Sequence, residues 1–330
     1  MINTERFSKG LRKRGIDREN KRILITDFHG SEQEQDLTEP ANCDGVGRIR
    51  HFKRHQKNPS WPPNPLPIDP ATKVMHLPRT DTLRTQAFQN AICNWRCWYC
   101  FVDFDLLSGN LAKAQWLTAD DLLARYFAQP DPPVMIDLTG GQPDLVPEWI
   151  PWMIQAAIAS GKSERVYLWS DDNLSNDYFW HFLTDTEREL IATYPRYGRV
   201  CCFKGFNSSS FGFNTDADPV LFDRQFDLFR RLRSTGMDLY AYTTFTTPEP
   251  KGITDDMKRF VDRLQEISPS LPLRTVPLEI ALFTPVRGRL RDDHREAIRL
   301  QYDAIDAWKK ELDTRFTSLE RAQPITEVPR

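Results

Sequence analysis

The sequence predicts an α/β protein built on a partial (β/α)6 barrel. From residue 83 onward, short strand-like segments alternate with longer segments of helical periodicity, the order typical of a parallel sheet covered by helices. Polar residues follow each strand-like segment directly. Reactive groups gather at the carboxyl ends of parallel strands, because the loops there are free to vary. Six such units over roughly residues 80–310 would curl into an incomplete barrel.

Each expected strand is a short apolar run that ends at a polar or glycine-containing segment. The first delivers a cysteine-containing loop at its carboxyl end, and the second leads into a Gly-Gly turn. The expected strands span 83–92, 133–138, 166–169, 199–203, 239–245 and 276–283.

The expected helices carry their own start and stop signals. Thr118 is a good N-cap, and Asp120 and Asp121 in the first turn favour a helix start there. Gly161 and Gly236 mark the ends of the second and fourth helices. The expected helices span 118–127, 147–160, 178–194, 219–235, 255–267 and, as a long terminal helix, 292–316.

The first eighty residues differ from the rest, and we expect an irregular extension packed on the core. The basic run from Lys9 to Arg22 is most simply a solvated face. Six prolines between Pro59 and Pro70 remove backbone donors and fix φ, which predicts an extended connector rather than helix or strand. Its apolar side chains should lie over the folded body: Trp61, Leu66 and Ile68. The expected division is 1–80 for the extension, 81–291 for the barrel and 292–330 for a C-terminal helix and tail.

The composition is that of a globular, enzyme-sized protein. Of 330 residues, 27% are charged and 40% are apolar, which favours neither disorder nor a membrane span. The net charge of −2 gives no global electrostatic reason to expect nucleic acid. Six cysteines and no apolar signal segment predict a reduced, cytoplasmic protein.

Cys93, Cys97 and Cys100 lie within eight residues of one loop, so their thiolates can converge on one metal centre. Thiolates are soft ligands suited to iron–sulfur clusters. An ordinary [4Fe–4S] cluster takes four cysteines, so a trio leaves one iron open to a substrate or cofactor. Disulfides are disfavoured by the reduced compartment. A zinc site would need a fourth ligand, and no histidine or cysteine follows within several dozen residues.

A second metal site, for zinc, was weighed in the extension. Its ligands would be Cys43, His51 and His55, with His29 upstream. The spacing fits no compact zinc motif, and neighbouring lysines and arginines oppose a dication. We do not expect zinc there.

The turn Thr139-Gly140-Gly141-Gln142-Pro143 follows the second strand. With the cysteine spacing and the aromatic Tyr99 before the last cysteine, it resembles the radical S-adenosylmethionine (radical SAM) enzymes. That family has a Cys-x3-Cys-x2-Cys loop followed by a Gly-Gly-Glu-Pro turn. Gln142 stands where the family usually has glutamate, which keeps an acceptor but loses the charge.

The resemblance implies a [4Fe–4S] cluster whose open iron is chelated by S-adenosylmethionine. Reductive cleavage of that cofactor would give a 5′-deoxyadenosyl radical that abstracts hydrogen from a substrate, with a donor such as flavodoxin or ferredoxin supplying the electron. Cys93, Cys97 and Cys100 are the implied cluster ligands and catalytic residues. The implied cofactor-binding residues are Tyr99, Gly140, Gly141, Gln142, Pro143, Ser170, Asp171, Lys204 and Thr284.

Several of these residues have a plainer alternative. Lys204 is expected to meet the cofactor's carboxylate, or else to be an exposed lysine at a strand end. Ser170 and Asp171 could instead cap the following helix. Cys201 and Cys202 are adjacent on a strand, so only one can face the barrel interior. An inward thiol could donate hydrogen to a radical, although most buried free cysteines only pack.

Among the subfamilies, the pattern is closest to the activating enzymes of glycyl-radical proteins. Their fourth strand carries Asp-x-Lys, where this chain has Cys202 and Lys204 and so keeps only the lysine. Their sixth strand ends Pro-Tyr-His, whereas this chain has Leu282-Phe283-Thr284. After Cys100 only Cys201 and Cys202 remain, too few for an auxiliary-cluster domain. We therefore expect a single-cluster enzyme acting on a small molecule, a nucleoside or a protein residue. A glycyl-radical activase and a non-catalytic cluster or zinc protein are the alternatives.

Overall fold

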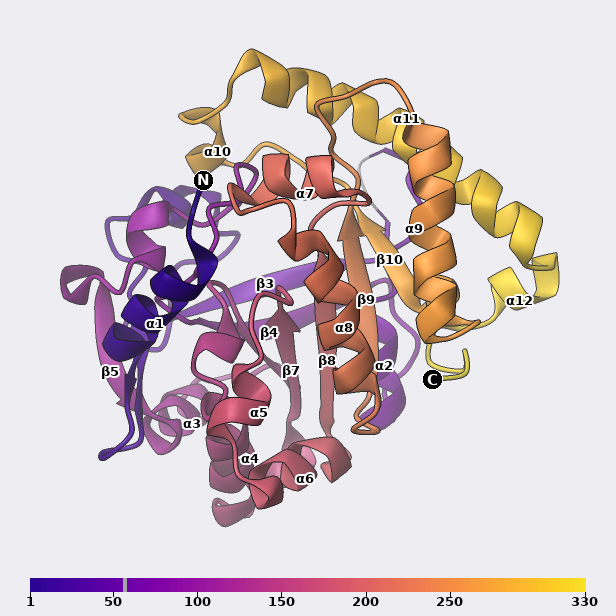
Figure 1. Ribbon diagram of the computed structural model, residues 1–330. Helices are drawn as coiled ribbons and strands as arrows, with labels where there is room; N and C mark the ends of the chain where they lie inside the picture. The colour runs from indigo at the N-terminus through magenta and orange to yellow at the C-terminus, as the bar shows by residue number, and fades with distance from the viewer. Residues whose placement is uncertain (56–57) are drawn as a thin grey trace.

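The computed structural model describes residues 1–55 and 58–330. Its main sheet has seven strands in the order β10-β9-β8-β7-β6-β4-β3, and it curls into a half-barrel (Figure 1). The six strands from β4 to β10 run parallel, and β3 is added antiparallel at the β4 edge. The predicted partial (β/α)6 barrel is confirmed. The strands are β3 (Gly47–Lys53), β4 (Thr82–Gln89), β6 (Met135–Thr139), β7 (Tyr167–Asp172), β8 (Tyr197–Phe203), β9 (Leu239–Thr244) and β10 (Thr275–Leu278).

Helices follow the parallel strands and cover one face of the sheet (Figure 1). The predicted start at Thr118 is confirmed, because its hydroxyl caps α3 in a capping box with Asp121. The α-helices of the barrel are α3 (Ala119–Phe127), α4 (Trp149–Ala159), α5 (Tyr178–Phe182), α6 (Asp185–Thr193), α7 (Ser208–Thr215), α8 (Leu221–Arg233), α9 (Ile253–Ile267), α10 (Thr284–Arg287), α11 (Asp292–Arg315) and α12 (Ser318–Ala322). Short 3-10 turns are η2 (Phe104–Leu107), η3 (Leu111–Lys113), η4 (Pro143–Leu145), η5 (Ser163–Arg165) and η6 (Leu271–Arg274).

Several expected elements differ in extent. The first strand, expected over 83–92, ends at Gln89, and the third, expected over 166–169, continues to Asp172. The single helix expected over 178–194 is two helices, because Leu183 is extended and Thr184 starts α6 with its own capping box to Glu187. The sixth strand, expected over 276–283, ends at Leu278.

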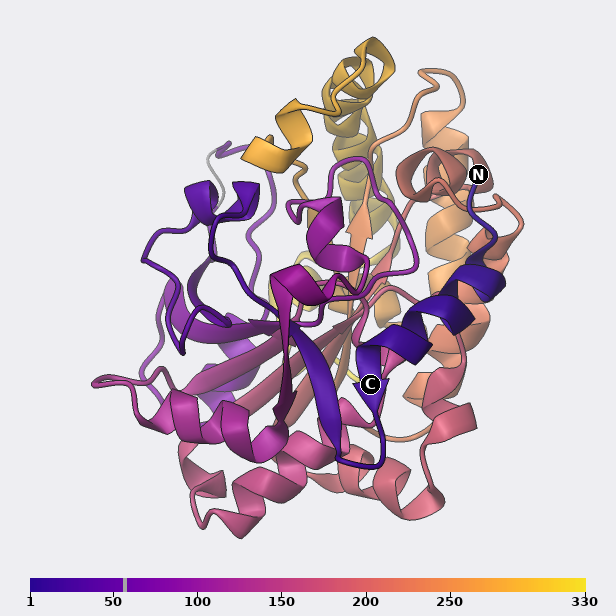
Figure 2. The ribbon, with the colours of Figure 1, turned by 90° about the vertical axis from the view of Figure 1, so that its left-hand side faces the viewer.

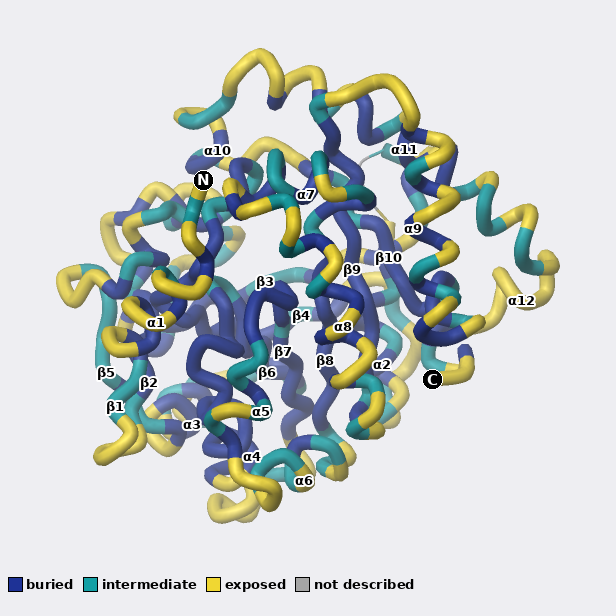
Figure 3. The backbone as a smooth tube through the Cα atoms, in the orientation of Figure 1, coloured by how far each residue is buried: buried dark blue, intermediate teal, exposed yellow. Residues whose placement is uncertain are grey.

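The two faces of the sheet build two separate cores. On the outer face, which the helices cover, Leu168 and Phe203 join a large cluster with α3, α4, α6, α8, α9 and α11. On the inner face, Trp169 and Cys202 join a smaller cluster that also takes Ile68 from α2 (Ile68–Val74). Alternate residues of a strand point to opposite faces, so each central strand contributes to both. The central strands are buried along their length (Figure 3).

The N-terminal extension is more regular than its composition suggests. It contains α1 (Thr4–Gly15), β1 (Ile16–Asp17), β2 (Arg22–Thr26), η1 (Glu32–Asp36), β3 and α2. β1 and β2 form a small sheet with β5 (Ala114–Thr118), which lies in front of the main sheet beside α1 in Figure 2. The irregular extension of the sequence prediction is therefore corrected: most of its strands pair with strands far along the chain.

The basic run is only partly the solvated face that was expected. Arg12 of α1 is 8% exposed and makes a two-pronged ion pair with Glu148, at 2.5 and 2.9 Å. Such planar pairing of a guanidinium with a carboxylate fixes geometry as well as charge. α1 is thus anchored to the segment that follows the Gly-Gly turn.

The proline-rich connector lies over the folded body, as predicted. Trp61, Leu66 and Ile68 are buried, and the Trp61 indole nitrogen donates to the carbonyl oxygen of Pro277 in β10 at 3.1 Å. The expectation of no helix there was wrong at its end, where α2 begins at Ile68. Among the described residues, no helix has the length and apolar character needed to cross a membrane.

Candidate functional site

The cysteine loop leaves β4 at the carboxyl edge of the sheet. Cys93 and Cys97 are buried and Cys100 is partly buried. Burial raises the pKa of Cys93, and it raises the pKa of Cys97 to about 12; nearby thiols, Cys100 among them, push both pKa values in the same direction. The three sulfurs are therefore close enough to influence one another's charge.

The chemistry of this donor set fits an iron–sulfur cluster. The thiols come from one loop, and a cluster places each thiolate on a different iron, so the sulfurs need not converge on one point. A buried donor lies near the first sulfur, with Asn173 Nδ2 4.0 Å from Cys93 Sγ. In residues 1–55 and 58–330, no group of three or more His, Cys, Asp or Glu side chains is arranged to hold a single metal ion.

The Gly-Gly turn is docked directly on the cysteine loop. The Gln142 backbone N–H donates to the carbonyl oxygen of Ile92 at 2.8 Å. Gly141 has φ +57°, and a Cβ there would lie 2.2 Å from the same Ile92 oxygen. At Gly140 a Cβ would lie 2.1 Å from the Gln89 side chain. Gly141 is thus required by the close approach of the Ile92 backbone and Gly140 by that of the Gln89 side chain, while their contact with the cofactor stays a prediction.

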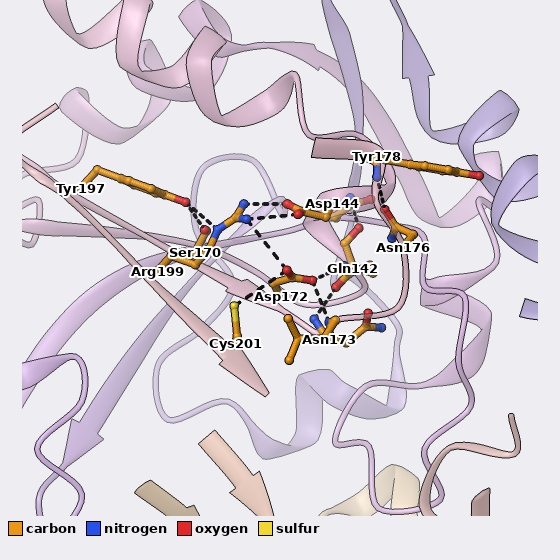
Figure 4. A network of polar contacts seen from close by, with 12 residues as sticks. Gln142, Asp144, Ser170, Asp172, Asn173, Asn176, Tyr178, Tyr197, Arg199 and Cys201 are labelled. Carbon is orange, nitrogen blue, oxygen red and sulfur yellow. Dashed lines mark hydrogen bonds and ion pairs between the residues drawn. The ribbon is translucent and has the colours of Figure 1, made fainter. Parts of the chain in front are cut away.

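The Gln142 side chain lies in a buried polar network between β7 and β8 (Figure 4). Its Nε2 donates to Asp172 Oδ1 at 2.7 Å, and its Oε1 accepts the Asn173 backbone N–H at 2.9 Å. Arg199 pairs with Asp144 at 2.6 Å and lies 3.9 Å from Asp172. Both polar atoms of Gln142 already have protein partners, so its predicted contact with the cofactor's amino group stays untested.

Neighbouring residues of β7 point to opposite faces. The Ser170 hydroxyl is 2.7 Å from the Tyr197 hydroxyl, inside the outer-face network (Figure 4). Asp171 accepts a hydrogen bond from Thr139 on the inner face. Neither residue caps a helix, because α5 begins after Asp177. Of the predicted pair, only Asp171 faces the barrel interior.

Lys204 lies close to the cysteine loop, near Tyr99 of that loop. Burial lowers the pKa of the Lys204 ammonium, but the ionisable groups of Cys202, Tyr99 and Cys97 outweigh burial and hold that pKa well above its ordinary value. The Tyr99 hydroxyl is 3.2 Å from Thr244 Oγ1, which ties the loop to the end of β9. Lys204 is partly buried, not the exposed strand-end lysine of the alternative.

The adjacent cysteines separate as strand geometry requires. Cys202 belongs to the inner-face core, near Lys204. Cys201 faces outward, with its sulfur 3.9 Å from Asp172 Oδ2. Only Cys202 therefore faces the barrel interior.

Thr284 and Pro143 are the remaining predicted residues. The Thr284 backbone N–H and hydroxyl both donate to Asp36 of η1, each at 2.8 Å, so its hydroxyl is bonded to the N-terminal extension. Pro143 is buried at the start of η4. Their cofactor contacts stay predictions.

The weighed zinc ligands of the extension are not brought together. His29 pairs with Asp27 at 2.9 Å, and His51 lies 3.4 Å from Glu39. His55 is 3.9 Å from Asp81, and Cys43 is buried with its pKa raised by burial to about 12.

Three polar residues of the inner face were missed by sequence reasoning. Arg48 and Arg50 of β3 point to this face, and Arg50 Nη1 donates to Asp137 Oδ2 at 3.0 Å. Burial, then repulsion from Asp171, raises the pKa of Asp137 to about 7. The sequence signal for the arginines is their spacing, because residues 48 and 50 of a strand lie on the same face. Sequence analysis considers them only as positive charge that disfavours zinc binding.

Comparison with known proteins by sequence gave no match. No protein-family model matches the chain. No curated protein matches it either.

Solved structures match the fold at low identity. Streptococcus suis SuiB bound to the precursor peptide SuiA matches with a TM-score of 0.42 and 16% identity, over 68% of this chain and 46% of SuiB. SuiB bound to S-adenosylmethionine gives 0.35 and 14%, over 52% of this chain and 35% of that one. Native anSMEcpe with bound AdoMet gives 0.33 and 11%, over 53% and 59%. This chain thus spans less than half of SuiB, and likeness at this level carries no conclusion about function.

Proposed function

We propose that this protein is a radical SAM enzyme. Cys93, Cys97 and Cys100 would hold a [4Fe–4S] cluster with one iron open to S-adenosylmethionine, and the enzyme would abstract a hydrogen atom from its substrate. The observation that carries the proposal is the meeting of the cysteine trio, the docked Gly-Gly turn and Lys204 at one edge of a parallel half-barrel.

When bound, the reduced cluster would supply the electron that cleaves the cofactor's carbon–sulfur bond, giving methionine and a 5′-deoxyadenosyl radical that would take a hydrogen atom from the substrate. The protein's part is to bind and orient. Lys204 would pair with the cofactor's carboxylate, because it is a cation close enough to the buried thiols Cys97 and Cys202 to lower their pKa values. The electron would come from a donor such as flavodoxin or ferredoxin.

The first test is anaerobic reconstitution of the full chain with iron and sulfide. We expect about four irons per chain, with reductive cleavage of S-adenosylmethionine to 5′-deoxyadenosine. Cys97→Ala should lose the visible absorbance and the cleavage, because the cluster loses one of three ligands.

The matched control is Cys43→Ala. Cys43 is also a buried free cysteine, but it belongs to the N-terminal extension. Its replacement should leave iron content and cleavage unchanged. Iron that binds equally well without Cys97, or a cofactor that stays intact after reduction, would overturn the proposal.

A further inference from the structure

Two arginines of β3 face the inside of the half-barrel. In the antiparallel register, Arg48 lies opposite Ala87 and Arg50 opposite Thr85. Ala87 in turn pairs with Asp137 of β6, so Arg48, Ala87 and Asp137 form one row across the inner face. Ala87 lies between Arg48 and Asp137 in this row, and its small side chain leaves room for theirs.

The two arginines differ in their partners. Arg50 donates to Asp137 Oδ2 at 3.0 Å and lies over the Phe52 ring at 4.0 Å. Arg48 is only 7% exposed, yet its Nε and Nη2 are shielded from solvent with no hydrogen-bond partner in the described part of the chain. Asp137 Oδ1 is likewise buried and unpaired there.

Unpaired buried groups of this kind are unfavourable. A buried donor without an acceptor loses its hydrogen bonds to water and gains none in return, and the penalty is larger when the donor is charged. The Arg48 guanidinium carbon lies 5.4 Å from the Phe101 ring centre and 6.0 Å from the Phe28 ring centre, and these rings offer its N–H groups no oxygen acceptor. Burial, then the charge of Arg50, lowers the pKa of Arg48 to about 10. The Arg48 guanidinium is thus buried with two N–H groups that lack acceptors among the described residues, and a bound anion would supply these acceptors.

The free atoms specify the chemistry of that anion. Nε and Nη2 form one edge of the guanidinium, and two parallel donors match the two oxygens of a carboxylate or phosphate. Phe101, whose ring Arg48 lies over, directly follows Cys100, so the guanidinium lies next to the cysteine loop.

We propose that Arg48 binds a carboxylate or phosphate group of the substrate, and that Asp137 accepts a hydrogen bond from a hydroxyl or amine beside it. This inference rests on the proposed function, since it assigns the substrate of that site. The substrate is therefore anionic. The cofactor's own carboxylate is assigned to Lys204, which lies near Cys97, Tyr99 and Cys202.

The test compares Arg48→Leu with Arg84→Leu in the reconstituted full chain. Arg84 lies on the neighbouring strand β4 but pairs with Glu39 and Asp131 at the surface, so its loss matches the charge change. The probes are inorganic phosphate and acetate, each titrated at constant ionic strength while binding is followed by calorimetry. The probe that binds more tightly names the group.

We expect Arg48→Leu to weaken binding of the preferred anion at least tenfold and to raise the unfolding midpoint, because an unpaired buried charge is removed. Arg84→Leu should bind the anion like the wild type. Affinity for S-adenosylmethionine should stay within twofold in Arg48→Leu and fall in Lys204→Met.

Three results would overturn the inference. They are unchanged anion binding in Arg48→Leu, loss of S-adenosylmethionine binding in that variant, or a lowered unfolding midpoint with no anion binding in the wild type. The proposed function fails separately: a wild type that binds phosphate through Arg48 but never binds or cleaves S-adenosylmethionine would refute the enzyme class alone.

Discussion

At the scale of single residues, the glutamine in the Gly-Gly turn has a local cause. Gln142 Nε2 donates to Asp172 Oδ1 at 2.7 Å, and Asp144 is also buried close by, its pKa raised by burial to about 7 despite Arg199. A glutamate at this position would add a third carboxylate to a site with one guanidinium. An amide donates where a carboxylate would repel, so the departure from the family pattern fits its surroundings.

Gln142→Glu is therefore expected to lower the free energy of unfolding by about 1–3 kcal/mol at neutral pH, because a donor is replaced by a like charge. Urea unfolding measures this directly. Gln323→Glu, at an exposed position near the C-terminus, is the control and should change stability by less than about 0.5 kcal/mol. Equal stability of the two variants would show that the network is not what selects glutamine.

At the scale of elements, α1 acts as a brace for the site. Arg12 pairs with Glu148 and also donates to the Leu145 carbonyl oxygen at 2.9 Å, just after the Gly-Gly turn. From the same helix, Thr4 accepts the Trp95 indole N–H at 3.1 Å. One helix thus contacts both the cysteine loop and the segment that follows the turn.

Two arginines near Glu148 allow a matched comparison. Arg12→Ala should cost about 3–5 kcal/mol of stability, because it leaves the buried Glu148 carboxylate without its main partner. Arg18 reaches the same carboxylate at 3.4 Å but is 63% exposed, so Arg18→Ala should cost less than about 1 kcal/mol. Chemical denaturation measures the stability of both variants. Equal, small losses in the two variants would mean that the whole basic run is solvated and that Arg12 does not anchor α1.

The elements that sequence analysis predicted well are those with local signals. The helix at Ala119–Phe127 was predicted from Thr118 as N-cap and from the acidic residues of its first turn, and the cysteine trio from its own spacing. β2 and β3 were missed because their hydrogen bonds go to β5 and β4, which are distant along the chain. For the same reason Arg48 was not recognised as a site residue. Its approach to Asp137 depends on the register of three strands.

At the scale of the whole molecule, the two faces of the sheet differ in the side chains that they bury. The outer face is covered by helices and carries most of the apolar core. The inner face combines a smaller core with charged residues, among them Arg50, Asp137 and Asp171. Burying an acid there makes the stability of the entire fold depend on pH.

The pKa of Asp137 is raised in the folded protein from 3.8 to about 7. A raised carboxyl pKa means that the folded state binds the proton more tightly than the unfolded state does. The resulting contribution to the free energy of unfolding is complete below about pH 4 and is lost as pH rises to about 7. Asp137→Asn should remove that loss. Relative to wild type, the variant should gain up to about 4 kcal/mol between pH 4 and pH 8.

Thermal or urea unfolding across that pH range tests the slope, independently of the absolute stability of the variant. Asp131→Asn is the control, since that side chain is 93% exposed and should leave the profile unchanged. A wild-type profile that Asp137→Asn does not alter would mean that this acid is ionised at neutral pH.

The contact of Trp61 with Pro277 also has a consequence for how copies of the protein behave toward one another. β10 is the last strand of the sheet, and a bare terminal strand invites the backbone of a second molecule to continue the ladder. At Pro277 the backbone has no N–H to offer, and its carbonyl oxygen already accepts the tryptophan's proton. The proline-rich connector therefore hinders the pairing of the edge strand β10 with a second molecule, which opposes aggregation.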